Sequence, residues 1–220
     1  MGNFFDVIMD LLLRLPAILI GISLHECAHA YAAYKLGDPT AKNMGRITLN
    51  PARHIHPIGF LMFIVFRFGW ANPVIINSRN FKNVRRDTAV VSLVGSVANF
   101  LLAFVSMGLM YLMLLTFQVT NYYVIMIILN LIIINVFLGI FNLIPIPPLD
   151  GYKILRSILP KRINPKFFWT LERYGFIILI GVFFLLSYTG ALDVISSALL
   201  RFLQGFYTNV CGLPSLGIFG

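Results

Sequence analysis

Four apolar runs, each long enough to cross a lipid bilayer, constrain this chain more than any other feature. They extend from about Leu11 to Tyr34, Thr88 to Phe117, Tyr122 to Ile144 and Phe176 to Leu200. A hydrocarbon core about 30 Å thick needs about 20 apolar residues in a helix, and lipid offers no water to exposed backbone groups. Only 11% of the 220 residues are charged, against about 25% in soluble domains. The sequence therefore predicts an all-α polytopic membrane protein with four transmembrane helices.

A fifth apolar run, Pro57 to Trp70, is shorter and contains Arg67, so we expect a re-entrant or interfacial segment. The stretches ITL (47–49) and VII (74–76) flank it, favour strands and are bounded by Asn, Pro and Gly. They predict a small β element at the cytosolic membrane surface. Residues 1–220 are interpreted as a single integral-membrane domain, with a core of about 15–160 and an additional C-terminal helix of about 175–203.

The distribution of basic residues predicts the topology. Fifteen of the 17 Lys and Arg residues lie between the first and second runs or between the third and fourth. By the positive-inside rule these connections are cytosolic and both termini lie outside, in a multi-pass protein of the cell membrane. The N-terminus lacks the basic segment and cleavage site of a signal peptide, so we expect the first run to be retained. The net charge of +9 does not indicate nucleic acid, because the basic residues are not gathered in a soluble domain with aromatic stacking positions.

The first run contains the segment HECAH, residues 25–29, at a depth where polar groups are costly and usually functional. In a helix, His25 and His29 lie about 40° and 6 Å apart on one face, so both imidazoles can bind one metal ion. Glu26 lies about 100° around the helix from His25, where it can accept a proton from a metal-bound water. A pair of buried structural histidines is the alternative interpretation.

A catalytic zinc ion needs a third protein ligand, and Asp150 is the best candidate among the acids. It follows the broken apolar stretch FNLIPIPPLDG and, in the predicted topology, lies in the same leaflet as His25. Closely spaced prolines cannot continue a helix, and irregular backbone at membrane depth is tolerated only beside protein or a water-filled cavity. The alternative is that Asp150 is an ordinary turn residue in the dipeptide Asp-Gly.

HECAH in the first run and NLIPIPPLDG at residues 142–151 resemble the paired motifs of the site-2 protease family of intramembrane zinc metalloproteases. The segment GSVAN, residues 95–99, is similar to the GxxxN element of that family. The resemblance covers about residues 15–160, and the connections are too short for a PDZ or CBS domain, so a compact form is expected.

The resemblance implies one zinc ion per chain with His25, His29 and Asp150 as ligands. It also implies that Glu26 is the general base and that Asn142 stabilises the oxyanion. Structural or substrate-binding roles are implied for the remaining motif residues, Gly95, Asn99 and Gly151. For the two asparagines a hydrogen bond between helices remains an alternative.

The implied activity is hydrolysis of peptide bonds in transmembrane segments of membrane-protein substrates. A zinc transporter or sensor is the main alternative, but a transporter should offer polar residues across the whole membrane, whereas the histidines and acids here cluster in one leaflet. A catalytically inactive binder of transmembrane helices is a third hypothesis. His54 and His56 could form a second metal site or join a four-histidine site, but we expect them in an interfacial loop.

Overall fold

The computed structural model describes residues 4–66, 71–160, 162 and 164–217. Among these residues, four helices are long and apolar enough to cross a membrane, which confirms the predicted class of fold. They are α1 (Phe4–Lys35), α4 (Val84–Tyr111) continued by the π-helical turn η3 (Leu112–Thr116), α5 (Tyr122–Asn142) and α7 (Pro165–Thr189). The shorter helices are α2 (Thr40–Asn43), η1 (Pro51–Arg53), α3 (Pro57–Phe66), η2 (Ser78–Asn80), α6 (Asp150–Ile158) and α8 (Ala191–Asn209).

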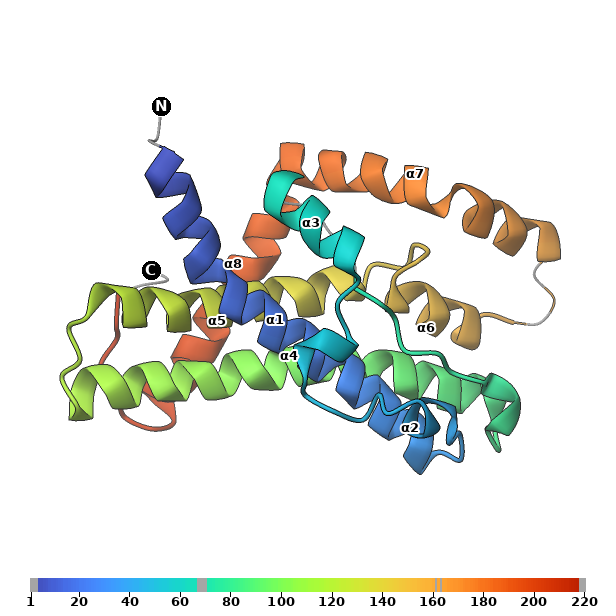
Figure 1. Ribbon diagram of the computed structural model, residues 1–220, viewed down its shortest axis with the longest axis horizontal. Helices are drawn as coiled ribbons and strands as arrows, with labels where there is room; N and C mark the ends of the chain where they lie inside the picture. The colour runs from blue at the N-terminus through green and yellow to red at the C-terminus, as the bar shows by residue number, and fades with distance from the viewer. Residues whose placement is uncertain (1–3, 67–70, 161, 163, 218–220) are drawn as a thin grey trace.

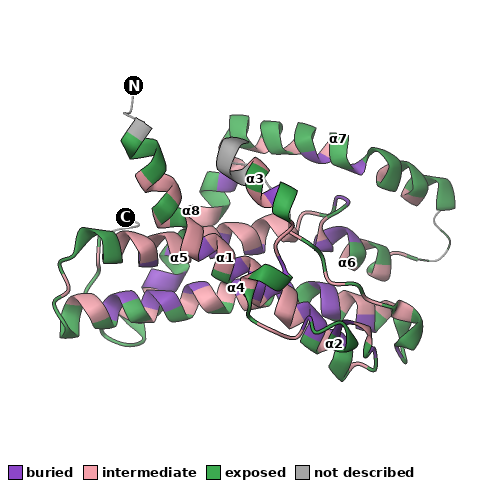
Figure 2. Ribbon diagram, viewed as in Figure 1, coloured by how far each residue is buried: buried purple, intermediate pink, exposed green. Residues whose placement is uncertain are grey.

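Helices α1, α4 and α5 form the centre of the molecule (Figure 1). α4 and α5 are antiparallel neighbours, α1 crosses both, and α6 packs against α4. Figure 2 shows buried positions on the facing sides of these helices, whereas α7 is largely exposed. Apolar side chains such as Leu101, Val105 and Ile177 are exposed on the candidate spans. Because lipid tails are as apolar as leucine, these side chains form the surface that lipid is expected to cover.

The last predicted run, Phe176 to Leu200, is not a single helix. α7 begins at Pro165, where Asn164 caps it by accepting a hydrogen bond from the Lys166 amide. It ends before Gly190, whose φ of +66° is the left-handed conformation that terminates helices and that glycine adopts without strain. α8 follows as a separate helix packed on α5. The number of spans agrees with the prediction, but the bounds of the last one are shifted.

The region between α1 and α4 differs from the predicted β element. The fifth apolar run forms the short helix α3, and its residues 67–70 lie outside the described part of the chain. Among described residues, neither 47–49 nor 74–76 is a strand, and an isolated antiparallel bridge joins Ile55 to Ala71. The β prediction is therefore wrong for these residues. Backbone groups of 72–77 bond instead to side chains of Arg46, Glu26 and Asp38, which satisfy them without a partner strand.

Candidate metal centre

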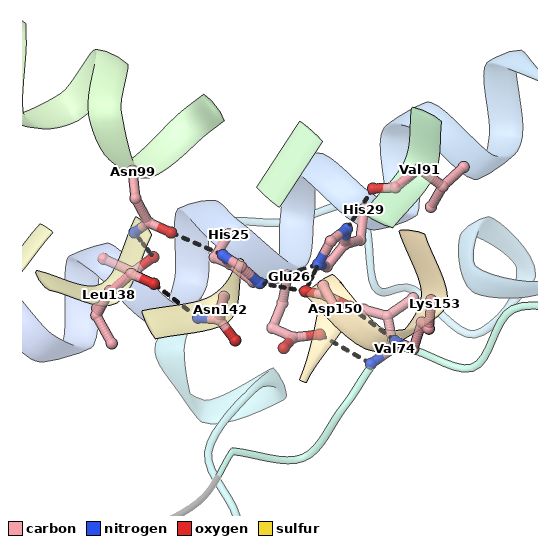
Figure 3. Close-up of polar contacts among 11 residues, drawn as sticks. His25, Glu26, His29, Val74, Val91, Asn99, Leu138, Asn142, Asp150 and Lys153 are labelled. Atoms are coloured by element: carbon pink, nitrogen blue, oxygen red, sulfur yellow. Dashed lines mark hydrogen bonds and ion pairs between the residues drawn. The ribbon is translucent and has the colours of Figure 1, made fainter. Parts of the chain in front are cut away.

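His25, His29 and Asp150 meet in the buried centre of the molecule (Figure 3). The two Nε2 atoms lie 2.9 Å apart, and Oδ2 of Asp150 lies 3.1 Å from that of His25 and 2.8 Å from that of His29. All three residues are at most 6% exposed. Within the described part of the chain, they are the one group of three or more side chains able to hold a metal ion together.

Each ligand candidate reaches this point for a local reason. α1 is continuous, so residues four apart project from one face, and the imidazole centroids of His25 and His29 are 4.5 Å apart. The first turn of α6 carries Asp150. Gly151 lets α6 fold back closely on the preceding loop, because a Cβ there would overlap the backbone carbonyls of Leu143 and Ile144.

One face of α4 orients both imidazoles. The carbonyl of Val91 lies 2.7 Å from Nδ1 of His29, and Oδ1 of Asn99 lies 2.7 Å from Nδ1 of His25. Gly95 lies between them, one turn from each, and leaves room for the two rings. Val91, Gly95 and Asn99 thus form a stripe along α4 at four-residue spacing, which we call the histidine-facing stripe.

This stripe determines which ring nitrogens carry protons. A carbonyl oxygen only accepts, so Nδ1 of His29 must donate to Val91. The Asn99 amide nitrogen donates to Gly21 O at 3.1 Å and to Asn135 Oδ1 at 2.8 Å, which leaves the Asn99 oxygen to accept from Nδ1 of His25. In the neutral rings both Nε2 atoms are therefore acceptors.

The donor set fits a zinc ion. Two Nε2 lone pairs and a carboxylate oxygen face one another at short distance, and three acceptors without a shared proton repel each other unless a cation lies among them. Two imidazoles and one carboxylate are a ligand set of catalytic zinc sites, and a hydrogen bond from the remote ring nitrogen is the usual partner of a histidine ligand. His25, His29 and Asp150 could hold such an ion.

Lys153 and Asn135 complete the surroundings of the centre, and sequence reasoning missed both. Nζ of Lys153 lies 2.8 Å from Oδ1 of Asp150, so this carboxylate presents its other oxygen to the histidines. Asn135 is fully buried in α5 and accepts from Asn99. The available signal for Asn135 was an asparagine inside an apolar run. The available signal for Lys153 was its position one helical turn beyond Asp150.

Glu26 and Asn142 lie outside the group of three. Oε2 of Glu26 accepts a hydrogen bond of 2.8 Å from the Val74 amide, and the residue is half-buried. Asn142 is the last residue of α5, and its amide nitrogen donates to Leu138 O of the same helix at 3.0 Å. Figure 3 shows both contacts.

The second histidine pair does not join the centre. His54 is fully buried, and its Nε2 donates to the Thr48 carbonyl at 2.8 Å. His56 precedes α3, and its Nδ1 accepts from the Gly59 amide at 3.4 Å. Among described residues, neither belongs to a group able to hold a metal ion.

Four candidate membrane spans and a buried His-His-Asp group are the features expected of a membrane protein with a metal site. Residues 112–187 match the model of Peptidase family M50. "Putative zinc metalloprotease YwhC" of Bacillus subtilis is 41% identical over 175 residues, which cover 76% of this chain and 77% of that protein. "Putative zinc metalloprotease Rip2" of Mycolicibacterium smegmatis is 31% identical over 170 residues, covering 74% and 62%. Rip2 of Mycobacterium tuberculosis H37Rv is 30% identical over 147 residues, covering 64% and 55%.

No solved structure matches the chain. The similarity to YwhC extends over more than two thirds of both proteins. The chain therefore belongs to peptidase family M50, the site-2 protease family, and is a zinc metalloprotease of that family.

Proposed function

We propose that this protein is an intramembrane endopeptidase that cleaves transmembrane segments of other membrane proteins, with one zinc ion bound by His25, His29 and Asp150. The burial of this group among candidate membrane spans, with Glu26 directly after the first histidine, carries the proposal. A zinc ion in this place would supply the Lewis acidity that activates water and polarises a peptide carbonyl.

The chain's own residues would move the protons. Glu26 accepts the proton of the attacking water and passes it to the leaving amine. The Val74 amide holds one oxygen of this carboxylate at 2.8 Å, which leaves the other oxygen for the proton. Asn142 would donate its amide to the oxyanion. That role requires the Asn142 amide to turn away from Leu138 O, to which it donates in this structure.

The substrate would enter from the lipid. A largely apolar cavity of about 650 Å³ lies between α1, α3, α5 and α7. Its lining extends along α1 from Asp10 to Ile22 and includes the charged side chains of Asp10 and Arg14 at one end. Ile22 lies one turn before Glu26, so the cavity leads toward the proposed base. Its apolar lining suits an apolar helix better than a soluble peptide. The cleaved helix would unwind locally, because a helical segment has its carbonyls bonded internally.

The distribution of basic residues supports an active site on the cytosolic side and both termini outside. α8 agrees with this orientation. Its Leu200 and Leu203 pack on Met107 and Tyr111 near the end of α4 and on Ile128 near the start of α5, which is the outer end of both helices in this topology. Because α8 is not among the candidate spans, the C-terminus would stay on that side.

The variant Glu26→Gln distinguishes a role of Glu26 as the base from a role as a metal ligand. We expect the variant to bind about one zinc ion per chain, as wild type does, and to lose cleavage of single-span model substrates in detergent. Asp193→Asn on the exposed face of α8 is the matched control and should retain both. Loss of zinc together with cleavage would assign Glu26 to metal binding instead, and full cleavage by Glu26→Gln would exclude it as the base.

A further inference from the structure

Residues 72–77, which we call the strap, run extended past Glu26 between α3 and η2. Charged side chains hold three successive parts of its backbone. Nη2 of Arg46 donates to the carbonyls of Asn72 and Pro73 at 2.7 and 2.9 Å. The Val74 amide donates to Glu26 at 2.8 Å, and the Asn77 amide donates to Oδ2 of Asp38 at 2.7 Å.

Arg46 and Glu26 bind opposite ends of one peptide group. The carbonyl of Pro73 and the N–H of Val74 belong to the same planar amide, so the guanidinium withdraws electron density from the unit that donates to the carboxylate. Hydrogen bonds linked in this way strengthen one another, especially away from water. Arg46 therefore fixes the position of this N–H and also makes it a stronger donor.

The burial of Arg46 is unusual for a cation. It is 7% exposed, and within the described residues all its hydrogen bonds go to backbone carbonyls, those of Arg53, Asn72 and Pro73. A buried charge without a carboxylate partner is costly, and a loop that only connected two helices would not require it. The carboxylate of Glu26 binds the other end of the peptide group that Arg46 binds.

Asp38 fastens the other end of the strap. It is fully buried just beyond α1 and accepts from Thr40, Asn77 and Asn80. Burial raises the pKa of Asp38, but the hydrogen bonds from Thr40, Asn80 and the backbone outweigh it, and the pKa lies below its ordinary value. Asp38 is thus ionised at neutral pH and anchors the strap to the same helix that carries Glu26.

We propose that Arg46 and Asp38 are positioning residues for Glu26 that act through the strap. They fix the position of the Val74 amide, which orients the catalytic carboxylate. The inference rests on the proposed role of Glu26 as the base. None of the strap contacts involves His25, His29 or Asp150, so the proposal predicts a loss of turnover without a loss of zinc.

Arg46→Met and Val74→Pro test the two ends of the shared peptide group. Arg46→Met removes the guanidinium, and Val74→Pro removes the N–H. Each should lower kcat by about tenfold or more with little change in KM and with zinc content unchanged. The double variant should be no slower than the slower single variant, because both changes break one path. Arg46→Lys keeps a charged donor and should recover part of the rate.

Arg79→Met is the matched control, since Arg79 lies outside the strap, is exposed and makes no side-chain hydrogen bond within the described residues, so its loss should leave kcat near wild type. Amide exchange adds a readout independent of activity: the Val74 amide should exchange faster in Arg46→Met than in wild type. Wild-type kcat in Arg46→Met, zinc loss in that variant, or additive effects in the double variant would each overturn the inference. Activity in Glu26→Gln would overturn the proposed role of Glu26 as the base. If Glu26→Gln is inactive while Arg46→Met is fully active, only the positioning role of the strap is overturned.

Discussion

Replacing Gly95 by alanine tests whether α4 sets the geometry of the metal centre. A Cβ at this position would lie 2.6 Å from Cε1 of both His25 and His29. Carbon atoms in contact are normally about 3.5–4.0 Å apart, so the rings or the helix would have to move by about 1 Å. The rings cannot yield independently, because each is bonded to α4 itself, one turn before and one turn after Gly95.

We expect Gly95→Ala to change zinc affinity much more than it changes stability. Alanine in place of glycine favours a helix by up to about 1 kcal/mol, while overpacking a core costs about 1–3 kcal/mol. Stability without metal should therefore change little or fall by up to about 2 kcal/mol. Disturbing the partners of histidine ligands typically costs 10–100-fold in metal affinity, and we expect Gly95→Ala to weaken zinc binding by about that factor.

The assay is a zinc titration against a competing chromophoric chelator in detergent, run beside thermal unfolding. Gly181→Ala in α7 is the matched control, because a Cβ there meets nothing within 4 Å. It should keep wild-type zinc affinity and should not lose stability. If Gly95→Ala binds zinc as tightly as the control does, α4 does not determine the ligand geometry and the reasoning from the histidine-facing stripe fails.

Two further predictions concern polar contacts around the site. Asn99→Leu leaves the His25 Nδ1–H without its acceptor and should weaken zinc binding by about 10–100-fold. Asn99→Asp keeps an acceptor oxygen and should bind zinc more tightly than Asn99→Leu in the same titration. Because the folded pKa of Asp38 is below its ordinary value of 3.8, its stabilising contribution is complete above that value and is lost as the pH falls through the folded pKa. Unfolding free energies of wild type and Asp38→Asn should therefore differ at neutral pH and converge in acid, and a constant difference down to the lowest pH would contradict the assigned hydrogen bonds.

The parts of the site that follow from helix periodicity could be predicted from the sequence. The spacing of His25 and His29 places both rings on one side of any continuous helix, and residue type with topology led to Asp150. The contacts that orient these side chains could not be predicted in the same way. Val91 contributes a carbonyl and Val74 an amide, groups that every position offers, so no side-chain pattern identifies them.

Tertiary contacts explain where local propensity failed. The stretch VII favours a strand, but the amides and carbonyls around it are bonded to Arg46, Glu26 and Asp38, which come from other parts of the chain. The last apolar run did contain a local signal. Gly190 interrupts it, and a glycine in the left-handed conformation ends α7 there, although hydropathy continues through the break.

The candidate metal centre depends on α4, although α4 supplies no ligand, because α4 orients both imidazoles. α1 carries both histidines and the proposed base, and α6 carries the carboxylate, but rotation of either ring would turn a protonated Nδ1 toward Asp150. The histidine-facing stripe prevents this, because it accepts both Nδ1 protons and commits both Nε2 lone pairs to one point. Lipid cannot supply substitute acceptors at this depth, so a helix must provide them. In the proposed zinc site, the pairing of α1 with α4 thus serves metal binding as well as packing.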